Sequence, residues 1–115
     1  MESILISIKK LLGVPEEYSQ FDPDIIIHIN TAFMNLTQLG VGPQKGFYIE
    51  DSETTWDEFV DTDRNAEFNA VKTYIYLKVK LLFDPPLSAA VMESIKNTIA
   101  ELEWRLNVAA ESAAK

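Results

Sequence analysis

The chain has a single histidine, His28, and Asp24 precedes it by about one helical turn. A histidine can act as a general base or bind a metal, but both roles need further groups around it, and none stands at a suitable spacing. A lone helical histidine beside an acid is more often structural. We therefore expect no catalytic residue at this position.

Carboxylates are plentiful, and they raise the question of acid–base or metal chemistry. Acid–base catalysis needs two carboxyl groups in one pocket with different pKa values, which adjacency in the sequence does not indicate. The run 61–65 matches the first three ligand positions of an EF-hand calcium loop. However, Ala66 stands where that loop needs glycine, and Lys72 where it needs glutamate. We predict no metal site. A metal-dependent hydrolase that uses the carboxylates of 50–63 is kept only as an alternative hypothesis.

Other signatures of catalysis are missing from the sequence. The chain has no cysteine, which excludes a thiol nucleophile, a zinc thiolate site and a disulfide. It has no glycine-rich phosphate loop and no nucleophile elbow. We therefore predict that the protein is not an enzyme and binds no cofactor.

Composition and charge narrow the class of protein. The 115 residues fit one domain, 1–115, and the 47% of hydrophobic residues can supply a core. The net charge is −8, and seven acids against two bases lie between 41 and 65. Such a chain lacks the basic face of a nucleic-acid binder, although an acidic surface could line a passage through which DNA slides. No apolar run is long enough for a membrane span, and the order of charges in 1–12 does not fit a signal peptide.

Helical periodicity predicts a small all-α bundle. The four expected helices are 2–12, 22–39, 65–83 and 88–110. We expect Gly13 to end the first helix in a left-handed conformation, and Asp22 and Ser88 to be the N-caps of the second and fourth. The core face of the first helix is predicted to hold Ile4, Leu5, Ile8, Leu11 and Leu12.

Residues 41–64 are predicted to form a long irregular loop between the second and third helices. The segment 47–49 could be a strand of a short hairpin, and Thr55 and Glu58 match a capping box that predicts a short helix. A loop of this length in a compact domain is usually functional or mobile.

Three apolar features do not fit a closed bundle. The stretch 69–83 is apolar on nearly every side, which predicts that it needs more partners than three other helices supply. Ile27 and Met34 lie opposite the core face of their helix, either as scattered surface residues or as a stripe used against a neighbouring subunit. Lys78 lies near the centre of an apolar side, where it could snorkel or form an inter-subunit ion pair.

The fourth helix has a predicted core face and an apolar surface that points elsewhere. The core face consists of Val91, Ile95, Ile99, Leu102 and Leu106. Trp104 and Val108 lie off this face, so we predict that they contact a partner.

Several segments together resemble one family, the phage head–tail connectors, which are the adaptor or head-completion proteins of long-tailed phages. The segments that carry the resemblance are 21–22, 29–30, 38–43 (QLGVGP), 55–57 (TWD), 74–86 (YIYLKVKLLFDPP) and 103–107 (EWRLN). These segments span nearly the whole chain. They resemble the family in the types and order of their residues, not through a catalytic signature.

The resemblance implies a structural protein of the virion, made in the host cytoplasm and placed at the head–tail interface. It implies a ring of about twelve copies that docks on the portal protein after DNA packaging and extends the DNA channel. Such a ring offers a platform for a stopper or tail-completion protein. DNA would pass without sequence-specific binding, and no membrane is involved.

Three sets of residues follow from this hypothesis. The candidates for the portal interface are Trp104, Arg105, Val108 and Lys115. The candidates for contacts between subunits are Ile27, Met34, Tyr76, Leu77 and Lys78. The candidates for a loop facing the lumen or the tail are Phe47, Tyr48, Glu50, Asp51, Glu53 and Trp56. The alternative is a small soluble helical module for protein–protein interaction, of a regulatory type outside the virion.

Overall fold

The computed structural model describes residues 2–60 and 65–114. Within them the chain forms four α-helices, one short 3-10 helix and no strand, which confirms the predicted all-α class. The helices are α1 (Ile4–Leu12), α2 (Asp22–Gln38), α3 (Asn65–Phe83) and α4 (Ala89–Ala114), with η1 (Trp56–Glu58) between α2 and α3. The EF-hand-like run at 61–64 and Lys115 lie outside the described residues.

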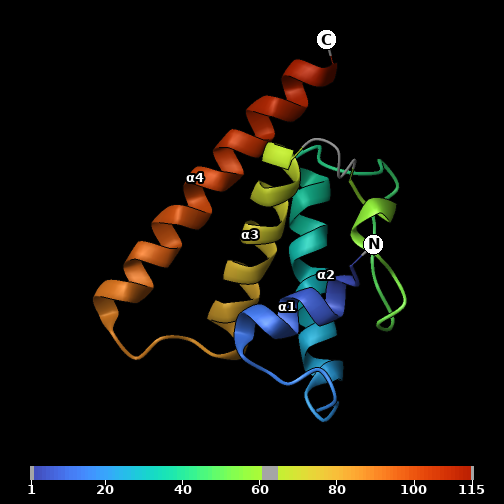
Figure 1. The fold of residues 1–115 in the computed structure, drawn as a ribbon. Helices are drawn as coiled ribbons and strands as arrows, with labels where there is room; N and C mark the ends of the chain where they lie inside the picture. The colour runs from blue at the N-terminus through green and yellow to red at the C-terminus, as the bar shows by residue number, and fades with distance from the viewer. Residues whose placement is uncertain (1, 61–64, 115) are drawn as a thin grey trace.

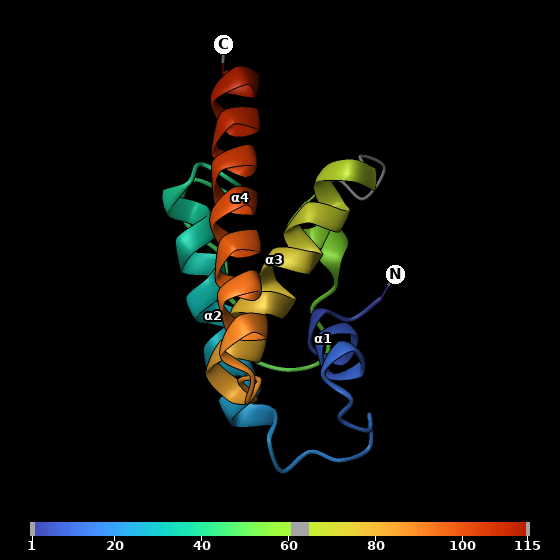
Figure 2. The same cartoon turned by 90° about the vertical axis from the view of Figure 1, so that its left-hand side faces the viewer.

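Helices α2 and α3 lie side by side at the centre, and α1 crosses them near one end (Figure 1). Helix α4 leans diagonally across α3 and projects past it at the C-terminus, which the second view also shows (Figure 2). Helix α3 is therefore the central element, with contacts to α1, α2 and α4. The core between these helices contains, among others, Ile8, Ile29, Phe33, Tyr74 and Ile75, all fully buried.

The caps of two helices agree with the sequence. Gly13 has the left-handed conformation (φ 81°) that only glycine adopts easily, and it ends α1. The backbone N–H of Val91 donates to Oγ of Ser88 at 3.3 Å, so Ser88 is the N-cap of α4.

The predicted cap of α2 is wrong. Phe21 occupies the N-cap position and makes no side-chain cap hydrogen bond, whereas Asp22 is the first helical residue. The reason is a competing ion pair: Oδ1 of Asp22 lies 2.9 Å from Nζ of Lys9 on α1.

The predicted core face of α1 needs a related correction. Leu11 is 45% exposed, while Lys9 is 1% exposed. Lys9 can be buried because its ammonium also donates to the backbone oxygens of Glu16 and Tyr18, which satisfies its charge inside the fold.

The expectation that α3 needs partners outside the subunit is wrong for most of the helix. Among its large apolar side chains in the described part, Leu82 alone is exposed, at 52%. Three helices pack on α3, and Trp56 of the loop after α2 packs against Phe68, so its large apolar side chains other than Leu82 are buried or half-buried within the subunit.

Only part of the predicted core face of α4 is buried. Ile99 and Leu106 are buried, but Val91 is 48% exposed. The linker after α3 carries the chain away from the bundle before α4 begins, so the first turns of α4 stand apart from α3 (Figure 1). Leu87 in this linker is fully exposed.

The loop after α2 packs on α2 without a strand at 47–49. Asn30 on α2 holds it: Oδ1 accepts from the N–H of Ile49 at 2.8 Å, and Nδ2 donates to Ile49 O at 2.9 Å. The side chain of Asn30 thus takes the hydrogen bonds that a partner strand would have made. The capping box of Thr55 and Glu58 is confirmed, and it starts η1.

Gly42 allows a close approach within this loop. Its φ of 86° is in the left-handed region, and a Cβ atom at this position would overlap the ring of Phe59. Phe59 in turn packs against Phe33 on α2, with ring centroids 4.6 Å apart. The loop therefore closes one side of the core instead of standing away from it.

Candidate interaction surfaces

The exposed face near the end of α4 carries an unusual apolar pair. Trp104 is 66% exposed and Val108 is 41% exposed, and their spacing of four residues places them on one side of the helix. Arg105 lies next to Trp104 and pairs with Glu101, with Nη2 and Oε1 2.8 Å apart. We call Trp104, Arg105 and Val108 the α4 face. It has the composition of an interface centre, an aromatic residue beside an arginine.

Two polar contacts fix the α4 face relative to the bundle. The hydroxyl of Tyr74 on α3 donates to Oε2 of Glu103 at 2.7 Å, and Nδ2 of Asn107 donates to Leu39 O at 3.1 Å. Burial, and then the hydrogen bond and charge of Glu103, raise the pKa of Tyr74 well above its usual range. Helix α4 is thus tied to both α3 and the end of α2.

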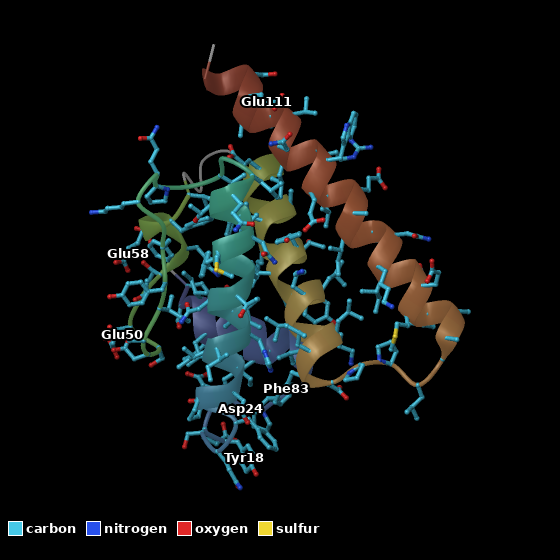
Figure 3. All side chains as sticks on the ribbon, turned by 180° about the vertical axis from the view of Figure 1, so that it is seen from behind. Tyr18, Asp24, Glu50, Glu58, Phe83 and Glu111 are labelled. Carbon is cyan, nitrogen blue, oxygen red and sulfur yellow. The ribbon has the colours of Figure 1, made fainter. Side chains whose placement is uncertain are left out.

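The loop after α2 forms an acidic surface on another side of the molecule. Tyr48 is 66% exposed, and Glu50, Asp51 and Glu53 are also exposed. Figure 3 shows Glu50 and Glu58 on the side of α2 opposite to α4. The acidic surface and the α4 face can therefore meet different partners.

A pocket of about 420 Å³ lies between the C-terminal ends of α2 and α4. Its wall on one side is the stretch 37–44, without Val41, and on the other side Asn107, Ala110 and Glu111 of α4. No sequence pattern indicates this pocket, because its two walls are far apart along the chain.

A metal centre would need several ligating side chains in one place. In the part of the chain that the structure describes, no three histidine, cysteine or acidic side chains come together as a metal site would require. His28 is half-buried on α2, apart from any such group. None of the described helices is both long and apolar enough to cross a membrane.

A family model with the description phage connector protein matches residues 4–113, from the start of α1 to the last turn of α4. The chain belongs to this family of phage connector proteins. The family is structural rather than enzymatic, and the resemblance to head–tail connectors is thereby confirmed. Neither the search of curated proteins nor that of solved structures returned a match.

The structure of this connector removes one residue from the candidates for a lumen-facing surface. Trp56 is fully buried, and its Nε1–H donates to Oγ of Ser7 at 2.8 Å. Its assignment to that surface is wrong, because the capping box turns η1 so that Trp56 points into the core. Phe47 is half-buried against Phe33, with ring centroids 5.0 Å apart, so only part of its side chain is available to a partner.

The candidates for contacts between connector subunits fall into two groups. Ile27 and Met34 are 60% and 56% exposed on the outer side of α2. Tyr76 and Leu77 instead are partly buried and pack against the core. Lys78 is half-buried and forms no ion pair with a described residue, which leaves both of its predicted roles open.

One feature that the sequence did not indicate is a cluster of three aromatic side chains where α2 begins and α3 ends. Phe21 packs edge-on against Tyr18 and against Phe83 at the end of α3, with both pairs of centroids 5.3 Å apart. Figure 3 shows Tyr18 and Phe83 at the same end of the molecule. Phe21, which stands just before Asp22 and Pro23 at the start of α2, was the available signal in the sequence. Its contact with Phe83 on α3 could not be inferred from sequence spacing.

Proposed function

We propose that this connector forms a ring that docks on the portal protein after DNA packaging and extends the DNA channel. In this role it provides the platform for a stopper or tail-completion protein, and it acts in the virion at the head–tail interface. The observation that carries the proposal is the α4 face, an exposed tryptophan and valine on a helix fixed to the bundle in a member of the connector family.

Exposure supports the assignment of the α4 face to the portal. A tryptophan that is 66% exposed leaves most of a large apolar ring in water, and a partner that covers it gains binding free energy. Arg105 can keep its pair with Glu101 and still offer free N–H groups to a partner.

Contacts within the ring would use different surfaces. Ile27 and Met34 on α2 lie on the far side from its core face, whereas the exposed Leu87 and Val91 lie in the linker before α4 and in its first turn. Surfaces of this kind can meet head to tail between neighbouring copies, and a closed series of such contacts gives a ring.

The acidic surface suits a position beside the DNA or toward the tail. Carboxylates repel phosphates, so a loop that carries Glu50, Asp51 and Glu53 would let DNA pass without holding it. A ring structure in which these residues face outward would contradict the lumen assignment.

Co-assembly with the portal tests the proposal. The connector is mixed with purified portal rings of its phage, and complexes are separated by size and imaged by electron microscopy. We expect a second ring layer on the portal that is lost in Trp104→Ala and kept in Glu93→Gln, an exposed change on the other half of α4. Absence of any complex would favour the regulatory interaction module instead.

A further inference from the structure

We propose that the pocket between the ends of α2 and α4 is a receptor for an arginine side chain of a protein partner. The inference deepens the proposed function, and it rests on that function only for the identity of the protein that supplies the arginine. The pocket has a volume of about 420 Å³, within the range of sites that hold a small group.

The described residues give the pocket a negative character. It lies at the C-terminal end of α2, where the helix dipole leaves partial negative charge. Glu111 lies on its rim and forms no ion pair with a described residue. The other acids in this half of α4 are engaged, because Glu101 pairs with Arg105 and Glu103 accepts from Tyr74. Among the residues that the structure describes, no lysine or arginine lines the pocket.

The acceptors in the pocket fit a forked donor better than a point charge. Gln38 and Gly40 belong to its lining, and their backbone oxygens accept no hydrogen bond from the rest of the described chain. The side-chain amides of Gln38 and Gln44 and the carboxylate of Glu111 add further acceptors. A guanidinium group has five donors in one plane and can satisfy several such oxygens at once.

The pocket is continuous with the α4 face. Glu111 follows Trp104 by seven residues and so lies on the same side of the helix, two turns further on (Figure 3 labels Glu111 near the C-terminal end). A partner that covers Trp104 and Val108 would therefore bring its next residues to the pocket. The partner's surface should be positively charged where it meets the pocket, because the connector carries a net charge of −8.

Titration with a single side chain tests the chemistry directly. Arginine amide is added to isotope-labelled connector at physiological ionic strength, and the backbone amide signals are followed by NMR. The matched control ligand is citrulline amide, which has nearly the same shape and no charge on its side chain. We expect saturable shifts confined to residues 37–44 and 107–111 with arginine amide and none with citrulline amide.

Two variants sharpen the test. Glu111→Gln should weaken arginine binding by about fivefold, because a charge-assisted hydrogen bond becomes a neutral one. Glu93→Gln removes an exposed carboxylate elsewhere on α4 and should leave binding unchanged. Equal binding of citrulline, shifts centred on the acidic surface, or no effect of Glu111→Gln would each overturn the inference.

The failure of this inference can be told apart from failure of the proposed function. If Glu111→Lys leaves binding to portal rings unchanged while the wild-type connector shows the arginine shifts in the titration, the pocket is an arginine receptor but takes its arginine from another protein. A connector that never binds portal rings contradicts the proposed function, while the titration still decides the pocket.

Discussion

Nζ of Lys9 lies 2.9 Å from Oδ1 of Asp22, and the lysine is 1% exposed. The same ammonium donates hydrogen bonds to Glu16 O at 2.9 Å and to Tyr18 O at 2.8 Å, and its charge pairs with Asp22. The buried Asp22 oxygen has no hydrogen bond of good geometry, and the charge of Lys9 is what compensates it. One side chain of α1 therefore holds both the connecting segment and the start of α2.

Replacement of this lysine should destabilise the fold. Lys9→Met keeps the length of the side chain but leaves Asp22 without its counter-charge and two backbone oxygens without their donor. We expect the free energy of unfolding to fall by about 3 kcal/mol, as for other buried ion pairs that lose one partner. Urea denaturation measures it. Lys10→Met, at the exposed neighbouring position, should change it by less than about 0.5 kcal/mol, and equal losses in both variants would contradict the role of Lys9.

These contacts mark the limit of what the sequence predicts. The bounds of α3 were predicted at both ends, because its apolar residues keep a helical spacing until Asp84 and Pro85, where the helix cannot continue. The burial of Lys9 was not, since two of its acceptors are backbone oxygens that no sequence pattern reveals. The irregular path of 47–49 depends on Asn30, 19 residues before Ile49. The pocket likewise depends on two segments that only the tertiary fold brings together.

The two tryptophans should respond in opposite ways to the same substitution. Trp56 is fully buried and hydrogen-bonded to Ser7, so Trp56→Ala should lower the free energy of unfolding by about 3–5 kcal/mol. Trp104→Ala should lower it by less than about 1 kcal/mol, because the ring is mostly exposed. Thermal denaturation followed by circular dichroism measures both.

The same pair separates folding from docking. If Trp104 contacts the portal, Trp104→Ala should weaken binding to portal rings by about tenfold or more. A loss of several kcal/mol of monomer stability in Trp104→Ala would place the residue in the core and remove the α4 face as a portal contact.

Alkaline pH should weaken the anchor of α4 on α3. Burial and Glu103 raise the pKa of Tyr74, so the folded state keeps the phenol neutral at pH values where the unfolded chain loses the proton. This contribution to stability is complete below pH of about 10 and is lost as the pH rises toward the folded-state pKa. Tyr74→Phe should cost about 1 kcal/mol at pH of about 8, and its deficit relative to the wild type should shrink above pH of about 10. A deficit that stays constant with pH would contradict this.

The outer side of α2 offers a test of ring formation. Ile27→Asp places a charge on a residue that is 60% exposed, so the monomer should stay folded while assembly of the ring on the portal is impaired. Electron microscopy counts the assembled rings, and circular dichroism checks the fold. Asn69→Asp, an exposed change on α3, is the control and should assemble normally. A collapsed monomer would refute the assignment.

The two hydrogen bonds between Asn30 and the backbone of Ile49 have a thermodynamic consequence for whatever meets the acidic surface. A single bond would leave the loop free to swivel, whereas two bonds to one residue fix both its position and its rotation on α2. The ordering entropy of Glu50 and its neighbours is therefore spent during folding rather than at the encounter with a partner. An association at this surface starts from a preorganised charge pattern, and more of its interaction energy remains available as affinity.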